Sequence, residues 1–554
     1  MVRKIYQLNE TILHLPIVDI SEEEKRYIRI VDLDSGKQFA EFRIGLAAEN
    51  ADFYCPLYLN ELAGHVVELS CKDESAPDDL FDSIIVGGEM EERTDLYPDL
   101  YREEGRQQVH FSPKRGWLND PNGLVYVNGE FHMNYQHNPY GPTHGAVNLS
   151  WGFAVSRDGV HFKEYPDVIR PWDMQTSIAS GSAIVDENNL SGYGKGTVLA
   201  AYTALANRIF DERKPVGTRG QMLMYSTDGG YSFQYFEKNP IIPSSPTQGW
   251  RDPKILSMED GSLCIAVYEK YEGKNCVSFY SSNDCVNWTF RSRTMDLYEC
   301  PDLFEMTAAE SGEKKWILYG GNGMYRVGTF ENYAFTQIGE SHYLDYGSAT
   351  YAGQTFNSHP DKDSRYHMAW MRDLSQSWHY NPDDEKHGLA FSQSMSLICR
   401  FTFHDTKLGY RLFRVPIEAF SALRKKEAKV MEGSVGDRDE YDRKACVIPL
   451  EVPGDAEITI DAQRFVCLLV NGSGFTYYPD TGILQFTSQK EYRLTTKGVF
   501  RVRIVTDAKS IEFFICDEIS ATFSNVEKEK ALTIESEAAS WKCSLWQLES
   551  IWKK

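Results

Sequence analysis

Trp117-Leu118-Asn119-Asp120-Pro121-Asn122-Gly123 combines an acid, two amides and an indole in one short run that Pro and Gly punctuate. Its Asp-Pro-Asn-Gly portion has the composition of a turn. Because Pro121 disfavours the helical region for the residue before it, we expect Asp120 to lie at the extended end of a strand. By itself the run would be an ordinary surface turn, so its meaning depends on what surrounds it.

A predicted hairpin follows this run, and similar hairpins recur along the chain. Alternating segments at 124–126 and 130–135 flank Val127-Asn128-Gly129, which predicts a strand, an Asn-Gly turn and a second strand. Three runs share a serine, an aspartate near a turn and then an aromatic residue: S-R-D-G-V-H-F at 156–162, S-T-D-G-G-Y-S-F at 226–233 and S-N-D-C-V-N-W at 282–288. Repeated hairpins of this kind indicate the blades of a β-propeller, although three unrelated hairpins with the same turn chemistry are an alternative.

The chain divides into β-rich regions, so we predict an all-β fold. Helical periodicity is scarce, and most segments are short alternating runs that end in Gly, Asn or Asp. We predict four parts: an N-terminal β-rich accessory domain at 1–105, a β-propeller at 106–412, a linker at 413–427 and a C-terminal β-sandwich domain at 428–554.

The first region is the least defined by its sequence. Acidic stretches at 73–82 and 89–104 are typical of a linker, and short helices are expected near 97–105 and 416–426. Packing on the propeller, self-association and glycan binding are the alternative roles for this region, and packing is the simplest of them.

Composition and charge argue against several classes of protein. A net charge of −22 argues against nucleic acid or an anionic membrane as the main partner. No apolar run approaches the length of a membrane span. The N-terminus lacks the apolar segment of a signal peptide, so we expect a cytoplasmic location, or secretion if a leader has been removed.

The cysteines point to reduced thiols. Their number, 11, is odd, and they form no CxxC pair, which does not suit a disulfide framework. No clustered Cys/His spacing suggests zinc, so we expect neither a metal nor a cofactor. A homo-oligomer is compatible with the sequence.

Two further acids have distinctive neighbours, and with Asp120 they make a set. Asp252 lies in Trp-Arg-Asp-Pro-Lys at 250–254, and Glu299 lies in Tyr-Glu-Cys-Pro-Asp at 298–302. Each of the three acids lies at or just before an X-Pro turn, and such turns gather at one mouth of a propeller channel. Converging carboxylates suit glycoside hydrolysis, in which one acid is ionised and another donates a proton. A third acid, paired with arginine, would stay ionised and bind ring hydroxyls.

These motifs together resemble glycoside hydrolase family 32, the family of invertases, inulinases and levanases. The resemblance extends over about residues 106–550, and the set is specific although each member is weak. Besides the three acidic motifs it includes H-F-S-P at 110–113, N-Y-Q-H-N-P at 134–139, S-W-G-F-A-V-S at 150–156, S-G-S-A at 180–183, R-V-G-T-F at 326–330, L-D-Y-G-S at 344–348, Y-A-G-Q-T-F at 351–356 and S-I-E-F-F-I-C-D at 510–517.

The resemblance implies a five-bladed propeller followed by a sandwich, and a retaining double displacement on a β-linked fructosyl unit of a small or polymeric fructoside. It assigns Asp120 as nucleophile, Glu299 as acid/base and Asp252 as transition-state stabiliser. It also implies a set of substrate-binding residues: Trp117, Asn119, Gln136, Trp151, Ser182 and Arg251. Cys300, next to the acid, is expected to face the opposite side of a strand as a small buried residue.

The chain departs from the family in places, and alternatives stay open. Phe153 stands where many members carry histidine, and the segment 388–395 lacks the family's Pro and Arg. A fructosyltransferase would use the same intermediate, and a non-catalytic carbohydrate-binding propeller is a further alternative. Linkage preference and exo or endo attack are expected to depend on loops at 204–219 and 373–387.

Overall fold

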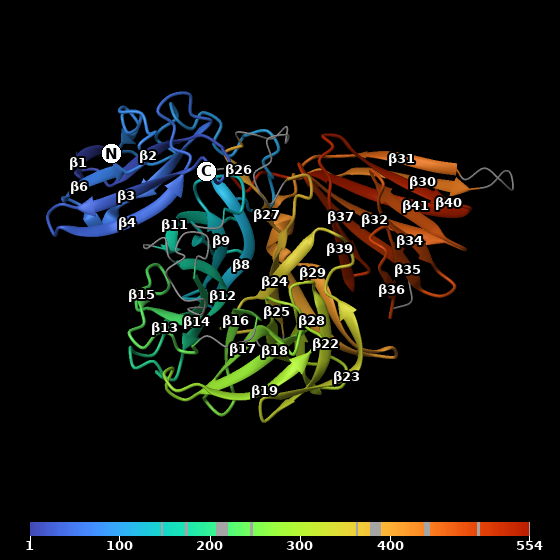
Figure 1. Cartoon of the computed structure of the whole chain (residues 1–554). Coiled ribbons are helices and arrows are strands. Elements are labelled where there is room, and N and C mark those ends of the chain that lie inside the picture. Colours follow the sequence, from blue (N-terminus) through green and yellow to red (C-terminus); the bar gives the residue numbers. More distant parts are fainter. Residues whose placement is uncertain are drawn as a thin grey trace.

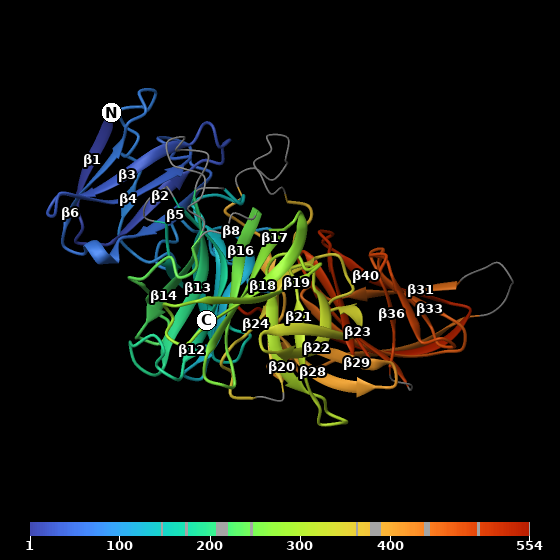
Figure 2. The ribbon, with the colours of Figure 1, turned by 60° about the horizontal axis from the view of Figure 1, so that its bottom comes forward.

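The computed structural model describes residues 1–145, 148–171, 176–206, 220–243, 248–361, 364–376, 389–436, 444–495 and 499–552. A propeller lies in the centre, an N-terminal β-rich module lies on one side and a C-terminal sandwich lies on the other (Figures 1 and 2). The predicted all-β fold is confirmed. Among the described residues no helix is long and apolar enough to cross a membrane.

The N-terminal module consists of two sheets that pack around their own apolar core. The sheets have the strand orders β1-β6-β3-β4 and β5-β2-β7. Leu15, Ile30, Val67 and Leu69 are among the buried residues between them. The elements are β1 (Val2–Gln7), β2 (Ile12–Ile17), β3 (Arg26–Asp32), β4 (Lys37–Ile44), β5 (Phe53–Tyr58), the 3-10 turn η1 (Asn60–Leu62), β6 (Val66–Cys71) and β7 (Ile85–Val86).

The acidic stretches after β6 are packed, which corrects the prediction of a linker. Leu80 and Phe81 belong to the core of the module, and Tyr97 is buried with its hydroxyl 2.7 Å from Nδ1 of His14. The helix expected at 97–105 is also wrong, because these residues form successive turns with hydrogen bonds between residues three apart. Apolar anchors spaced among the acids fix the segment to the module.

Within the described residues, five antiparallel sheets form the propeller. Their first strands contact one another around the centre, β8 with β12 and β24, and β16 with β12 and β20. From the inner strand outwards the blades are β8 (Gly116–Val127), β9 (Glu130–Asn138), β10 (Ser150–Ser156), β11 (Lys163–Ile169); β12 (Thr176–Asp186), β13 (Thr197–Ala206), β14 (Gly220–Ser226), β15 (Gln234–Tyr235); β16 (Gln248–Ser257), β17 (Leu263–Tyr271), β18 (Lys274–Ser282), β19 (Thr289–Met295); β20 (Asp302–Thr307), β21 (Lys314–Tyr319), β22 (Met324–Glu331), β23 (Ala334–Tyr343); and β24 (Thr350–Thr355), β25 (Arg365–Met371), β28 (Cys399–Thr406), β29 (Gly409–Pro416).

The three repeated serine–aspartate runs occupy the same place in three blades, between the third and fourth strands, as the repeat predicts. Asp158, Asp228 and Asp284 each accept hydrogen bonds from two backbone N–H groups that follow them. Each also accepts one from the serine hydroxyl two residues before it. An aspartate that binds backbone donors in this way closes a turn.

Two short strands join the end of the propeller to its beginning. β26 (Phe391–Ser392) runs parallel to the start of β8, and β27 (Ser394–Met395) pairs with β25. β29 extends to Pro416, past the predicted boundary at 412, and the 3-10 helix η2 (Glu418–Leu423) follows within the range where a short helix is expected. The domain boundaries themselves stay predictions.

Buried side chains connect the inner strands, which belong to separate sheets. Asn357 donates to the carbonyls of Ala183 and Ile255, at 2.8 and 3.0 Å. The Lys254 ammonium lies 3.1 Å from a carboxylate oxygen of Asp302. These hydrogen bonds and this ion pair are buried, and they hold the blades in one arrangement around the central axis.

The C-terminal domain is a sandwich of two sheets with a continuous apolar core. Ile458, Leu468, Ile504 and Phe513 are fully or almost fully buried between the sheets. In sheet order the strands are β30 (Lys429–Gly436), β41 (Ala538–Gln547), β32 (Gly454–Ala462), β37 (Phe500–Asp507), β38 (Ser510–Ile515), β39 (Ile519–Ser524); and β31 (Lys444–Leu450), β40 (Lys530–Ser536), β33 (Val466–Val470), β34 (Ser473–Tyr478), β35 (Ile483–Phe486), β36 (Glu491–Arg493).

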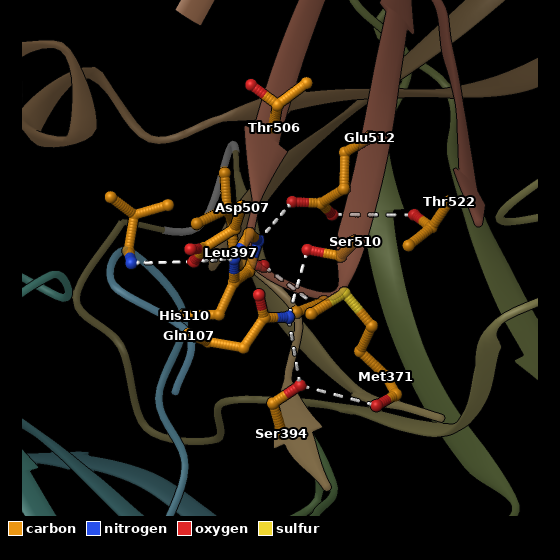
Figure 3. A network of polar contacts seen from close by, with 12 residues as sticks. Gln107, His110, Met371, Ser394, Leu397, Thr506, Asp507, Ser510, Glu512 and Thr522 are labelled. Atoms are coloured by element: carbon orange, nitrogen blue, oxygen red, sulfur yellow. Dashed lines mark hydrogen bonds and ion pairs between the residues drawn. The ribbon is translucent and has the colours of Figure 1, made fainter. Parts of the chain in front are cut away.

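A buried histidine joins the chain before the propeller to the sandwich (Figure 3). His110 Nδ1 lies 2.9 Å from Asp507, and Nε2 lies 2.7 Å from Glu512. Burial lowers the pKa of His110, but the hydrogen bonds to Asp507 and Glu512 outweigh burial and raise it to about 9. Gln107 adds a hydrogen bond to Ser510 of 3.0 Å. The contact is therefore an ion pair at neutral pH.

We predict that His110→Gln destabilises the protein by about 3–5 kcal/mol at about pH 6, because two buried carboxylates lose their cation. The pKa of His110 is higher in the folded chain than in the unfolded one. The contribution of protonated His110 to the free energy of unfolding is therefore complete below about pH 6.5 and is lost as the pH rises through about 9. Denaturant midpoints at about pH 6 and about pH 10 measure this, with the exposed His161→Gln as control. An equal loss at both pH values contradicts the ion pair.

Candidate active site

Asp120 lies inside the inner strand of the first blade, so the predicted turn at 120–123 is wrong. β8 continues through the Asp-Pro-Asn-Gly run, with register shifts against β9 on both sides of Pro121 and Asn122. Gly123 has a φ of +53°, and a Cβ there would meet the ring of Trp151 at 2.9 Å. The run encodes a bulged strand, and bulges re-aim side chains beside functional sites.

The other two acids come from the third blade and from the connection to the fourth. Asp252 lies within β16, where the register against β17 shifts on both sides of Arg251. Its φ of +62° is held by a hydrogen bond of 3.0 Å from its N–H to the hydroxyl of Thr203. Glu299 lies between β19 and β20. A non-glycine residue with positive φ inside a strand indicates local strain of the kind found at functional sites.

The three acids line one pocket of about 500 Å³. It is large enough for a small ligand. Its polar lining residues include carboxylates, amides, two guanidinium groups and a serine hydroxyl, and its apolar ones include two indoles and a phenol ring. The lining residues are Trp117, Asn119, Asp120, Gln136, His144, Leu149, Ala179, Ser180, Leu205, Arg251, Asp252, Glu299, Tyr351, Trp370, Arg372, Asp373, Leu374, Gln376 and Gln393.

Glu299 is fixed from both sides by hydrogen-bond donors. Arg251 donates to Oε2 through Nε, at 3.1 Å, and through a terminal nitrogen. The Tyr351 hydroxyl donates to Oε1 at 2.5 Å. The same guanidinium lies 3.4 Å from Oδ2 of Asp252, so one cation serves two carboxylates.

Burial raises the pKa values of the two aspartates. For Asp120 the hydrogen bond from Ser180 opposes the shift, and the charge of Glu299 adds to it. The pKa of Asp252 rises to about 7; Arg251 opposes that shift, and the charges of Glu299 and Asp120 add to it. Asp252 therefore holds a proton below about pH 7. Arg251 favours the ionised form of Asp252, as expected, but burial outweighs this effect, and the guanidinium directs its hydrogen bonds to Glu299.

Cys300 faces the site, which corrects the expectation that it turns away. Its φ is +44° and it lies outside the strands, so the alternation of side chains along a strand does not apply to it. Its sulfur lies 3.5 Å from Oδ2 of both Asp120 and Asp252, and its N–H donates to Asp252 at 3.2 Å. Burial raises the pKa of this thiol well above its ordinary value, so it remains a neutral donor.

Four of the predicted substrate-binding residues line the pocket, and two support its wall. Trp117, Asn119, Gln136 and Arg251 are in the lining. Trp151 and Ser182 are fully buried and lie outside it. The Trp151 indole donates to the carbonyl of Ala179 at 3.0 Å. The Ser182 hydroxyl donates to the carbonyl of Pro253 at 2.8 Å, which joins the second blade to the third.

Several pocket residues escape prediction from the sequence. Ser180 and Tyr351 begin the segments S-G-S-A and Y-A-G-Q-T-F, which indicate the family but not a contact with an acid. Trp370 comes from β25 of the fifth blade and Gln393 from the segment between β26 and β27, where no local motif marks them. Of the loops expected to set linkage preference, residues 207–219 and 377–387 lie outside the described residues.

Comparisons with known proteins show the family of the chain. The family model described as "Glycosyl hydrolases family 32 N-terminal domain" matches residues 110–413, which is more than half of the chain. The chain is 30% identical to a levanase of Bacillus subtilis over 467 residues, covering 75% of the chain and 65% of the levanase. It is 32% identical to invertase 1 of Saccharomyces cerevisiae, covering 54% of the chain and 58% of the invertase. The chain thus spans less than two thirds of each.

Solved structures show the same fold. The crystal structure of an exo-inulinase from Aspergillus awamori has a TM-score of 0.67 at 22% identity, covering 82% of this chain and 100% of that one. A beta-fructofuranosidase from Schwanniomyces occidentalis, complexed with fructosyl-erythritol, has a TM-score of 0.64 at 22% identity, covering 81% of this chain and 99% of that one. At this identity the likeness supports the architecture of propeller and sandwich.

We predict that Asp252→Asn stabilises the folded chain more at about pH 8 than at about pH 5, by on the order of 2–4 kcal/mol. The folded pKa of about 7 is above the ordinary value of an aspartate, so wild-type stability falls as the pH rises from about 4 to about 7. The neutral amide avoids this loss. Denaturant midpoints at the two pH values measure it.

Asp260→Asn is the matched control. Asp260 lies in a turn of the same blade, and hydrogen bonds from Ser262 lower its pKa, so its effect should not differ between the two pH values. If Asp252→Asn changes the stability equally at the two pH values, Asp252 is ionised in the resting site and the assignment of its pKa fails.

Proposed function

Because the chain belongs to glycoside hydrolase family 32, we propose that it hydrolyses β-fructofuranosidic bonds in sucrose, fructo-oligosaccharides or fructans with retention of configuration. The observation that carries the proposal is the convergence of Asp120, Asp252 and Glu299 in one pocket, with Arg251 between the last two. Two carboxylates with different environments are what a retaining glycosidase requires.

We assign the first chemical step to Asp120 and Glu299. The Asp120 carboxylate attacks the anomeric carbon, and the bond from that carbon to the leaving oxygen breaks. Glu299 gives its proton to that oxygen, so the leaving group departs as an alcohol. The product of this step is a fructosyl ester on Asp120. Ser180, which donates to Oδ2 of Asp120 at 2.7 Å, orients the carboxylate for attack.

The second step returns the enzyme to its starting state. Glu299, now ionised, takes a proton from water, and the water oxygen attacks the anomeric carbon and displaces Asp120. Arg251 and Tyr351 hold Glu299 in one orientation through both steps. The two donors bind both of its oxygens, so the carboxyl group does not rotate away from the leaving oxygen.

Asp252 has the task of binding fructose hydroxyls. In the resting site it holds a proton below about pH 7. Hydroxyl donors of a bound sugar favour its ionised form, and interacting carboxylates share their protons. We infer that substrate binding ionises Asp252 and leaves the shared proton for Glu299. The ionised Asp252 then stabilises positive charge at the anomeric centre.

The remainder of the pocket suits a small, neutral, hydroxylated ligand. Asn119 and Gln136 offer amide groups that both donate and accept, as sugar hydroxyls require. Trp117 and Trp370 provide indole surfaces for the apolar faces of a sugar. The chain's net charge of −22 is compatible with a neutral substrate.

A product profile tests the proposal. The protein is incubated separately with sucrose, an inulin-type oligosaccharide, inulin and levan, and the products are separated over time. We expect free fructose as the first product. With methanol present, we expect methyl fructoside of the same anomer as the substrate, because a second displacement at the same carbon restores its configuration. The opposite anomer would exclude the mechanism, and longer fructosides as main products would indicate a transferase.

Asp120→Asn and Glu299→Gln serve as the inactive controls. We expect Glu299→Gln to lower turnover roughly 10²–10⁴-fold, and Asp120→Asn to lower it at least as much, with the fold retained. Absence of product from the wild-type protein on all four substrates would favour a carbohydrate-binding propeller without activity.

We predict that Ser180→Ala moves the acid limb of the profile of kcat/KM against pH to higher pH. The Ser180 hydrogen bond lowers the pKa of Asp120, so its loss raises that pKa further, and Asp120 must be ionised to attack. Ser182→Ala is the matched control, since Ser182 lies on the same strand and contacts Pro253 and Ile255 instead. An acid limb that moves equally in both variants, or in neither, contradicts the role of Ser180.

A further inference from the structure

A segment of the first blade lies between the N-terminal module and the pocket. We name residues 138–145 and 148–149, which comprise the last residue of β9 and described parts of the connection to β10, the rim segment. Two of its residues, His144 and Leu149, line the pocket. The His144 ring meets Trp117 edge to face, with centroids 6.3 Å apart and planes at 82°. The position of the rim segment therefore sets part of the pocket wall.

The N-terminal module contacts this segment at several points. The Asn148 side chain donates to the carbonyl of Arg43 at 2.7 Å and accepts from its N–H at 3.3 Å. Both residues are buried. The amide of Asn148 thus pairs with both the backbone N–H and the backbone carbonyl of Arg43 in β4, as a neighbouring strand would. A side chain bound in this way cannot shift without leaving buried backbone groups unpaired.

A ring stack and a thiol hydrogen bond hold the other end of the segment. Tyr140 stacks on Phe42 of β4, with ring centroids 5.3 Å apart and planes at 18°, and packs against the core of the module. The Cys55 thiol of β5 donates to the carbonyl of Pro139 at 2.5 Å. The module therefore contacts the rim segment on both sides of His144, at 139–140 and at 148.

The module is attached to the propeller by other contacts as well. Arg170 pairs with Glu61 and donates to the carbonyl of Tyr58 at 3.1 Å. Lys114 pairs with Glu91 at 2.8 Å. None of these residues lines the pocket. Attachment of the module alone therefore does not require the contacts at 139–140 and 148.

We propose that the N-terminal module is a positioning element of the active site: through Phe42 and the Arg43 backbone it holds the rim segment, and thereby places His144 and Leu149 in the pocket wall. This role goes beyond packing on the propeller, and it rests on the proposed function insofar as the wall receives a fructoside. Phe42, Tyr140 and Asn148 are positioning residues, since they act on substrate through the segment.

Kinetics with sucrose and with an inulin-type oligosaccharide test the proposal. We expect Phe42→Leu and Asn148→Ala to raise KM by roughly three- to tenfold while kcat stays within about twofold, because the wall shifts and the carboxylates keep their partners. Glu61→Gln, which removes an attachment contact outside the rim segment, is the matched control and should leave both constants unchanged. A purely structural role would lower kcat through loss of folded enzyme and leave KM unchanged.

Hydrogen exchange of backbone amides tests the same claim without substrate. In Phe42→Leu and Asn148→Ala we expect faster exchange in residues 138–145 than in the wild type, and unchanged exchange in β8 and β9 up to residue 137. Glu61→Gln should exchange like the wild type. Exchange in 138–145 that is unchanged in both rim variants overturns the proposal, whether or not the protein proves to cleave fructosides. If the wild type cleaves none, the proposed function fails, and exchange alone decides this inference.

Discussion

Three acids line one pocket of the propeller, and the repulsion between their charges is the constraint on which the rest of the site depends. Buried carboxylates repel one another, so a site of this kind holds a proton at neutral pH. Arg251 takes Glu299 as its hydrogen-bond partner and stays at 3.4 Å from Asp252. Burial and the charges of neighbouring acids raise the pKa of both aspartates, and that of Asp252 rises to about 7 although Arg251 lies beside it.

The rest of the fold keeps that arrangement rigid. Inner strands of separate blades are joined by buried polar side chains such as Asn357 and Ser182. The flanking domains add support from two sides: the sandwich through the His110 ion pairs, and the N-terminal module through the rim segment. A pocket that must present several groups within tenths of an ångström needs such support, because small displacements lower the rate strongly.

The sequence predicts the fold and the three acids well, and the details of the site less well. Repeated aspartate turns and three acidic motifs mark the propeller and its centre, because both are local patterns. The sequence of the strand at 116–127 predicts a turn instead, since the same Pro and Gly that close turns also form bulges. The position of Cys300 depends on its backbone φ of +44°, and Trp370 enters the pocket from a strand far along the chain without a motif. Contacts that only the closed ring creates are not encoded in short runs.

The most direct test of the account is a search for the covalent intermediate on Asp120. Glu299→Gln is mixed with β-fructosyl fluoride, whose fluoride leaves without a proton donor, and the acid-quenched protein is digested and analysed by mass spectrometry. Without Glu299 to activate water the fructosyl ester should accumulate, so we expect the peptide that contains Asp120 to carry one fructosyl residue. Fluoride release with a label on another residue, or with none, would contradict a nucleophilic Asp120.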